Sequence, residues 1–143
     1  MTKSILLPVD LNHESSWNIA LPQAVALAKS DGAVLHVLTV IPDFGSSMVG
    51  SFFPEDFADN ALAETRAAQD KLVADNVPDD IETTALAVHG SIYNQILAVA
   101  DDNGCDLIVI GSTRPSMQDY LLGPNASRVV RHAKQSVFVV RIT

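Results

Sequence analysis

The chain alternates short apolar runs with longer segments in which apolar residues recur at helical spacing. Each apolar run is closed by a polar or turn-forming residue, as in strands that are buried on both faces. Continuous runs of this kind are typical of a parallel sheet with helices packed on either side. The pattern therefore predicts five strands, at Ile5–Val9, Val34–Ile41, Thr83–Val88, Leu107–Ile110 and Val137–Val140.

Four segments between these strands predict amphipathic helices, because their apolar residues recur every three or four positions. They span residues 14–30, 55–75, 91–103 and 123–134. Pro22 lies inside the first segment and is expected to kink that helix. Strict alternation of strands and helices predicts an α/β fold with an open five-stranded parallel sheet, helices on both faces and right-handed crossovers. Ligands of such folds bind beyond the carboxyl ends of the strands, so the loops there are the candidate site.

The length of 143 residues fits one domain, expected to span residues 1–143, and a hydrophobic share of 48% allows a sizeable core. No apolar run reaches the roughly 18 residues that a membrane span requires, and the apolar start is too short for a signal peptide. The net charge of −8 makes nucleic acid and anionic membranes poor partners, because phosphate groups repel an acidic domain. Cys105 is the single cysteine, which excludes an internal disulfide and favours a buried small hydrophobe in a reducing cytoplasm.

The segment Pro42–Pro54 is the least regular part of the chain and is rich in Gly, Ser and aromatic residues. It follows the second predicted strand, so it could fold over a ligand as a lid. An ordinary connecting loop explains the same composition equally well, and the sequence leaves both interpretations open.

Asp10 ends the first predicted strand at the edge of the sheet where ligands bind. Its carboxylate could accept hydrogen bonds from a ribose or from an adenine amine, but an aspartate in this position can equally cap a helix or a turn. The loop that follows matches neither the GxGxxG fingerprint nor a GxxxxGKS or GxxxxGKT phosphate loop. Rossmann-type dinucleotide binding and ordinary phosphate-loop chemistry are therefore disfavoured.

The loop after the fourth strand runs from Gly111 to the last helix and contains several groups that suit an anion. Gly111 lets the backbone approach a ligand closely, and Arg114 offers a fork of donors that suits phosphate oxygens. Pro124 is expected at the first helical position after Gly123, where free amides and the helix dipole attract anions. A structural glycine, a solvated arginine and an ordinary helix start are the competing interpretation.

The sequence shows no group of His, Cys, Asp and Glu residues with metal-ligand spacing, and no legible catalytic triad. Arg131 and His132 lie on the last predicted helix away from its first turn, which favours packing or surface roles for both. His13 and His36 are interpreted in the same way. The sequence therefore names no catalytic residue, and an enzymatic role is not favoured.

Several motifs together resemble the universal stress protein family over essentially the whole chain. The opening Ile5–Asp10 is similar to the family's I-L-x-P-x-D, and Ser136–Arg141 resembles its P-V-L-V-V-R ending. Gly111 and Gly123 match the first and last glycines of the family's glycine-rich loop. The Ser-Thr-Arg-Pro run after Gly111 and the Leu-Leu pair before Gly123 resemble the bacterial F/G branch in particular.

Two departures from the family pattern bear on binding. Arg114 stands where the common pattern has its middle glycine, which fits the F/G branch. Pro124 departs even from that branch, which usually has serine there. Proline removes one backbone N–H and the serine hydroxyl from the expected phosphate site, and each lost donor would cost roughly 1–3 kcal/mol if it faced a charged oxygen.

The resemblance implies the strand order 3-2-1-4-5 and the binding of ATP, with ADP and AMP as alternatives and Mg²⁺ bound through the phosphates. It implies that Asp10 and the backbone at Val40 contact adenine or ribose. Gly111 and Ser112 would line the ribose side. The phosphates would be held by Arg114, Gly123, Asn125 and Ser127, and the expected set is completed by Pro8, Val9 and Ala126.

The resemblance further implies an adenine-nucleotide-binding regulator of the stress response. A nucleotide-independent dimeric scaffold is the alternative that Pro124 and the missing middle glycine favour. A slow ATPase or self-phosphorylating protein is a third alternative, although the sequence offers it no clear general base. The last strand is expected at an exposed sheet edge, which predicts a homodimer through residues 137–142 that could pair again into a tetramer.

Overall fold

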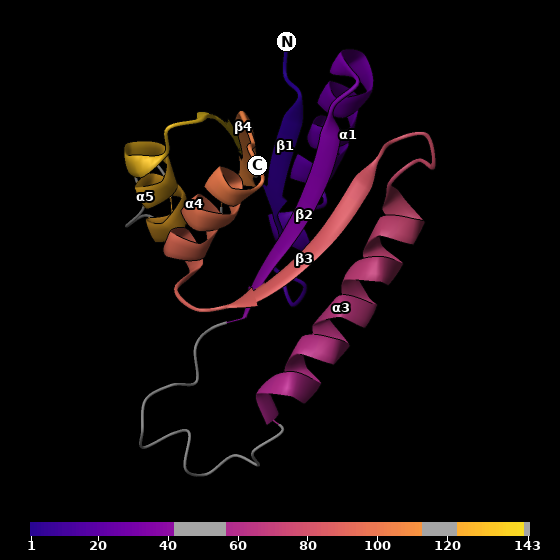
Figure 1. The fold of residues 1–143 in the computed structure, drawn as a ribbon, viewed down its shortest axis with the longest axis vertical. Coiled ribbons are helices and arrows are strands. Elements are labelled where there is room, and N and C mark those ends of the chain that lie inside the picture. Colours follow the sequence, from indigo (N-terminus) through magenta and orange to yellow (C-terminus); the bar gives the residue numbers. More distant parts are fainter. Residues whose placement is uncertain (42–56, 113–122, 142–143) are drawn as a thin grey trace.

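The computed structural model describes residues 1–41, 57–112 and 123–141 of the chain, so the candidate lid Pro42–Pro54 lies outside the described residues. Figure 1 shows one sheet with helices on both sides, and every strand pairing in it is parallel. The strand order β3-β2-β1-β4-β5 confirms the predicted fold class and the predicted order. The strands are β1 (Ser4–Pro8), β2 (Val34–Ile41), β3 (Thr83–His89), β4 (Leu107–Gly111) and β5 (Ser136–Val140).

Three of the predicted helices are present with ends shifted by one or two residues: α3 (Phe57–Asn76), α4 (Ile92–Asp102) and α5 (Pro124–His132). The prediction of one kinked helix over residues 14–30 is wrong. That segment forms a single 3-10 turn, η1 (Glu14–Ser16), and a separate helix, α1 (Ala20–Asp31). Pro22 lies in the first turn of α1, where the backbone N–H has no intrahelical acceptor, so the proline interrupts nothing. Not one of the described helices combines the length and apolar character needed to cross a membrane.

The core has two layers, one on each face of the sheet. Neighbouring residues of β1 point to opposite faces, and Ile5, Leu6 and Leu7 are all fully buried. Ile5 and Leu7 pack with side chains of α1 and α3, whereas Leu6 packs with side chains of α4 and α5. Figure 1 shows the same division, with α4 and α5 together on one side. Coverage of both faces explains why the strands read as continuous apolar runs.

A small polar network lies at the amino-terminal edge of the sheet, opposite the ligand edge. Cys105 is buried, as predicted, and its Sγ accepts a hydrogen bond from Ser4 Oγ at 3.5 Å. Burial raises the pKa of the Cys105 thiol, which keeps the sulfur protonated and unreactive. The ring of His36 lies between the hydroxyl groups of Ser4 and Thr84 and hydrogen-bonds with both.

β5 forms one edge of the sheet. Its backbone pairs with β4, and in the described part of the chain no strand lies on its other side. Phe138, in the middle of β5, leaves 37% of its surface exposed. The predicted position of the last strand at an open edge is therefore confirmed, whereas the pairing of two chains through it stays a prediction.

Candidate functional site

A cleft of about 550 Å³ opens at the carboxyl edge of the sheet, above the ends of β1, β2 and β4. The strand order reverses between β1 and β4, because the chain moves outward to β2 and β3 and then returns to the other side of β1. Open α/β sheets bind ligands at this reversal, where the loops diverge and leave space. The walls of the cleft come from the loop after β1, from α3, and from the first turns of α4 and α5.

Asp10 lines the cleft, two residues after the end of β1. Its carboxylate is part of a turn, because Oδ1 accepts the N–H of Asn12 at 3.0 Å and Oδ2 lies 2.9 Å from Nδ1 of His13. The two interpretations of this aspartate are therefore compatible. The turn fixes the direction of the carboxylate, and about half of the side chain remains exposed and available to a ligand.

Ser16 fixes the loop after β1 through hydrogen bonds of its hydroxyl group to the backbone of that loop. Its buried hydroxyl accepts the N–H of Asp10 at 2.9 Å and donates to the carbonyl oxygen of His13 at 2.7 Å. The backbone carbonyl of Ser16 lies against Gly111, the last residue of β4, and a β-carbon there would come within 2.6 Å of that oxygen. The close approach that requires glycine at position 111 is thus made by the protein's own loop.

The first turn of α5 also lines the cleft. Gly123 is buried at the N-cap with an extended backbone, and Pro124 occupies the first helical position, as predicted. The N–H of Ser127 is the first to bond within the helix, to the carbonyl of Gly123 at 2.9 Å. The amides of Asn125 and Ala126 precede it and have no intrahelical acceptor, so they are available to an anion at the positive end of the helix.

The structure brings most of the predicted site residues together around this cleft and separates a few from it. Ser112 is buried and does not line the cleft, and its N–H is bonded to the carbonyl of Val140 at 2.8 Å. Gly123 is buried, Ser127 is exposed outside the lining, and Arg114 lies outside the described residues. The predicted residues that line the cleft are Pro8, Val9, Asp10, Val40, Gly111, Asn125 and Ala126.

Sequence reasoning missed the wall that α3 contributes. Ala61, Glu64, Thr65 and Ala68 recur at the spacing of one helical face, and all four line the cleft. A face that packs against a sheet usually carries large apolar residues, so this run of small and polar residues was a legible signal of open space. Without a recognisable motif, nothing in the sequence tied that face to the loops after β1 and β4.

Thr39, on β2, adds a second missed feature. It lines the cleft and is 7% exposed, and its Oγ1 is buried with no hydrogen-bond partner among the described residues. An unsatisfied buried hydroxyl costs free energy, so its position in the cleft calls for an explanation. No group of three or more His, Cys, Asp or Glu residues in the described ranges could hold a metal ion.

Comparison with known proteins gives a consistent result along the whole sequence. Residues 1–141 match the model of the universal stress protein family. The chain is 34% identical to universal stress protein G of Shigella flexneri and of Escherichia coli O157:H7 over 143 residues, which cover 99% of this chain and 100% of each relative. It is 30% identical to a putative universal stress protein of Staphylococcus epidermidis, covering 97% of this chain and 84% of the relative.

Solved structures share the fold. The hypothetical protein MJ0577 superposes with a TM-score of 0.79 at 25% identity, covering 99% of this chain and 96% of that one. The universal stress protein UspA from Lactobacillus plantarum gives a TM-score of 0.74 at 25% identity, with 97% of each chain covered. A universal stress protein crystallised in complex with cAMP gives 0.67 at 22% identity, covering 99% and 98% of the two chains.

Proposed function

This chain belongs to the universal stress protein family, and we propose that it binds an adenine nucleotide and acts as a regulator of the stress response. The proposed ligand is ATP, with ADP and AMP as alternatives. The observation that carries the proposal is that the Asp10 carboxylate and the first turn of α5 face one cavity at the strand-order reversal. An acceptor and a positive helix end in one cleft match the two ends of a nucleotide.

The size and polar groups of the cleft support a nucleotide. Its volume falls within the range of roughly 300–1,000 Å³ that is usual for small-molecule sites. Asp10 offers an acceptor to ribose hydroxyls or an adenine amine, and the backbone of Val40 lies in the same wall. The amides of Asn125 and Ala126 offer donors to phosphate. The side chain of Ser127 does not line the cleft, so in this proposal the backbone of α5 takes the phosphate-binding role expected of that residue.

Magnesium in this proposal is bound mainly through the phosphates of ATP. Mg²⁺ commonly keeps several waters and takes only one or two protein ligands beside substrate phosphates. The protein then does not need a full set of metal ligands of its own. The complex of another universal stress protein with cAMP adds that a purine nucleotide is a ligand of at least one protein with this fold.

The proposal extends to assembly and location. The chain is proposed to act as one domain in the cytoplasm and to form a homodimer through residues 137–142, with a tetramer as a further step. The open edge of β5 and the partly exposed Phe138 support the dimer, because an unpaired edge strand with apolar side chains favours pairing with another strand.

A dimeric scaffold that binds no nucleotide is the second candidate function. Pro124 favours it, because this residue occupies the first position of α5 and contributes no N–H to the anion end of the cleft. The two candidates differ in one measurable property, the effect of nucleotide on stability.

Thermal unfolding with and without nucleotide tests the proposal. Mg·ATP should raise the melting temperature, and a ligand at about 100 times its dissociation constant adds roughly 2.7 kcal/mol to the free energy of unfolding. Asp10→Asn keeps an acceptor for the turn but removes the charge, and should weaken ATP and adenosine alike. Asp70→Asn, on an exposed position of α3, is the control. Unchanged melting in millimolar Mg·ATP would overturn nucleotide binding and favour the scaffold.

A further inference from the structure

Positive charge is concentrated at one end of this acidic chain. Residues 120–143 contain four Lys or Arg residues and no Asp or Glu, although the whole chain has 9 basic and 17 acidic side chains. A uniform acidic surface would serve solubility equally well. The segregation therefore points to a local role for the positive charge.

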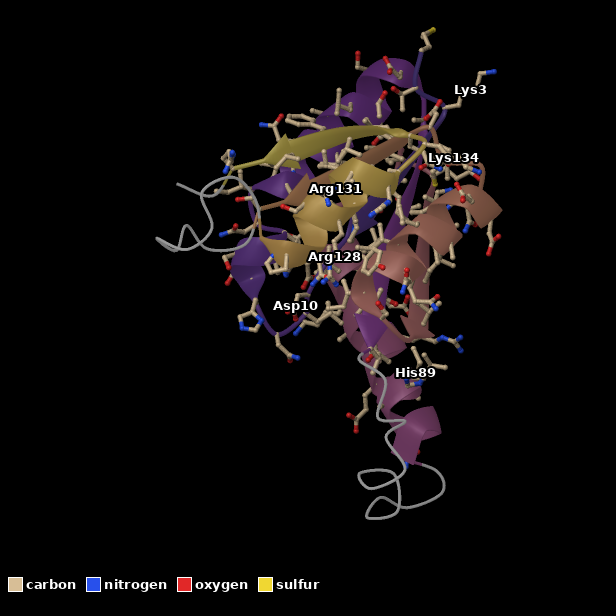
Figure 2. All side chains as sticks on the ribbon, turned by 90° about the vertical axis from the view of Figure 1, so that its left-hand side faces the viewer. Lys3, Asp10, His89, Arg128, Arg131 and Lys134 are labelled. Carbon is tan, nitrogen blue, oxygen red and sulfur yellow. The ribbon has the colours of Figure 1, made fainter. Side chains whose placement is uncertain are left out.

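Three of these cations form a row along α5. Arg128 and Arg131 are three residues apart on the helix, and Lys134 follows three residues later, just beyond its end. Figure 2 shows the three along α5. All three side chains belong to exposed residues, and none forms an ion pair within the described ranges. These three residues are named the basic stripe.

Helix electrostatics account for only part of the basic stripe. A cation in the last turn of a helix is stabilised by the helix dipole, which explains Arg131. Arg128 lies before that turn, and Lys134 lies beyond the end of the helix. Like charges three residues apart repel each other, so the row is unfavourable for the isolated protein.

Arg128 is held in place on the surface. Its guanidinium lies 5.1 Å from the centre of the Tyr93 ring on α4, a cation–π contact that restricts the side chain. The Tyr93 ring is itself only partly buried. A preorganised guanidinium beside a partly exposed aromatic ring is typical of protein-binding surfaces, where arginine and tyrosine are enriched.

We propose that the basic stripe is a docking surface for an acidic segment of a partner protein, one in which Asp or Glu residues accompany apolar ones. The planar forks of Arg128 and Arg131 match carboxylates in bidentate geometry, and the Tyr93 ring beside Arg128 supplies an apolar contact. The surface lies on the outside of α5 and does not depend on the nucleotide proposal.

Two other occupants fit the charges less well. Asp101 lies beside the Lys134 end of the stripe, where its carboxylate accepts a hydrogen bond from Gln135. A long nucleic acid would extend beyond a helix of 9 residues onto this acidic surface, whereas a short segment can contact Arg128 and Arg131 alone. A second copy of the chain, docked through the same helix, would face the stripe with its own cations. Charge complementarity therefore selects a short acidic segment.

Fluorescence anisotropy with a labelled peptide of Glu and interspersed Leu residues tests the proposal. The peptide should bind the unmodified protein, and binding should weaken as salt is added. The double variant Arg128→Glu/Arg131→Glu should weaken binding by about tenfold or more, because two charge contacts become repulsive. Lys29→Glu/Lys71→Glu changes the net charge equally at exposed positions of α1 and α3, and should have a much smaller effect.

Three results would overturn the proposal. They are absence of peptide binding at low salt, an equal loss in both double variants, and tighter binding of a single-stranded DNA of the same net charge. The last result would assign the stripe to nucleic acid. Circular dichroism reports whether the variants fold, and the milder Arg131→Gln, at an exposed position, provides the same comparison if the double variant does not.

Discussion

The carbonyl oxygen of Ser16 lies 2.6 Å from the point where a β-carbon on Gly111 would stand. This contact joins the loop that carries Asp10 to the end of β4, and so fixes one side of the cleft relative to the other. The family motif suggests that glycine is required at position 111 so that a ligand can approach the backbone. The structure shows another requirement for glycine there, because a side chain would clash with the loop after β1.

Gly111→Ala should therefore disturb the site from within. Since the clashing atom belongs to the backbone, the loop after β1 must move, at a cost of roughly 1–3 kcal/mol in the free energy of unfolding. Under the proposed function, affinity for both adenosine and ATP should fall with it. Chemical denaturation and calorimetric titration measure the two effects.

Gly32→Ala is the matched control for that variant. Gly32 has a φ of +66° at the end of α1 and no atom within 4 Å of an added β-carbon, so alanine strains the backbone without displacing a neighbour. It should lower stability while leaving nucleotide affinity unchanged. A Gly111→Ala protein that binds nucleotide normally would show that the Ser16 contact does not position the site.

The elements of this fold were legible in the sequence because each strand is buried on both faces. Runs such as Val34–Ile41 then contain few polar residues, and their ends coincide with turns. The split of residues 14–30 was not legible, because helical spacing continues through η1 into α1 and only the position of Pro22 relative to the helix start decides whether it kinks. η1 ends at Ser16, which contacts Gly111 of β4, and such a contact between residues distant in the sequence cannot be inferred from local spacing.

The candidate site was predictable only where a motif marks it. Asp10 follows β1 and the loop that leads into α5 follows β4, so the rule that ligands bind at strand ends locates both. The α3 wall lies on a helix whose small residues, such as Ala61 and Ala68, resemble ordinary helix formers. The role of Thr39 depends on an unsatisfied hydroxyl, which is a property of the packed structure.

Pro124→Ser restores a backbone N–H and a hydroxyl at the first position of α5, beside the amides that face the cleft. If phosphate binds there, affinity for ATP should rise by up to about tenfold per recovered hydrogen bond, whereas adenosine should be unaffected. Calorimetric titration with both ligands measures the difference. Equal affinities before and after the change would mean that phosphate does not reach this helix.

His36 should make stability depend on pH in a defined window. Burial lowers the pKa of its imidazole below the ordinary value of 6.5, against an opposing effect of Glu82. The unfolded chain therefore takes up a proton before the folded chain does, and stability falls as the pH drops below about 6.5 towards the folded pKa. Above that window the contribution is fully present, because both states hold a neutral ring.

His36→Gln should remove this dependence between neutrality and about pH 5, where most carboxylates are still ionised. Denaturant titrations at several pH values give the slope. His132→Gln, at an exposed position of α5, is the control and should retain the slope of the unmodified protein. A slope that survives His36→Gln would assign the pH dependence to another group.

The last prediction concerns the open edge of β5. Phe138 is 37% exposed in the single chain, whereas Val139 packs partly against the layer formed by α4 and α5. A charge at Val139 would disturb that layer, so Phe138→Asp is the cleaner test of pairing through residues 137–142. Pairing across a two-fold axis would place Phe138 of each copy near the interface, and burying a carboxylate there without a partner is strongly unfavourable. Sedimentation should therefore show a dimer for the unmodified protein and a monomer for Phe138→Asp.

Ile19→Asp is the control, because Ile19 has the same 37% exposure at the start of α1 and lies outside the edge. A monomer at micromolar concentration in the unmodified protein, or loss of the dimer in both variants, would contradict assembly through β5.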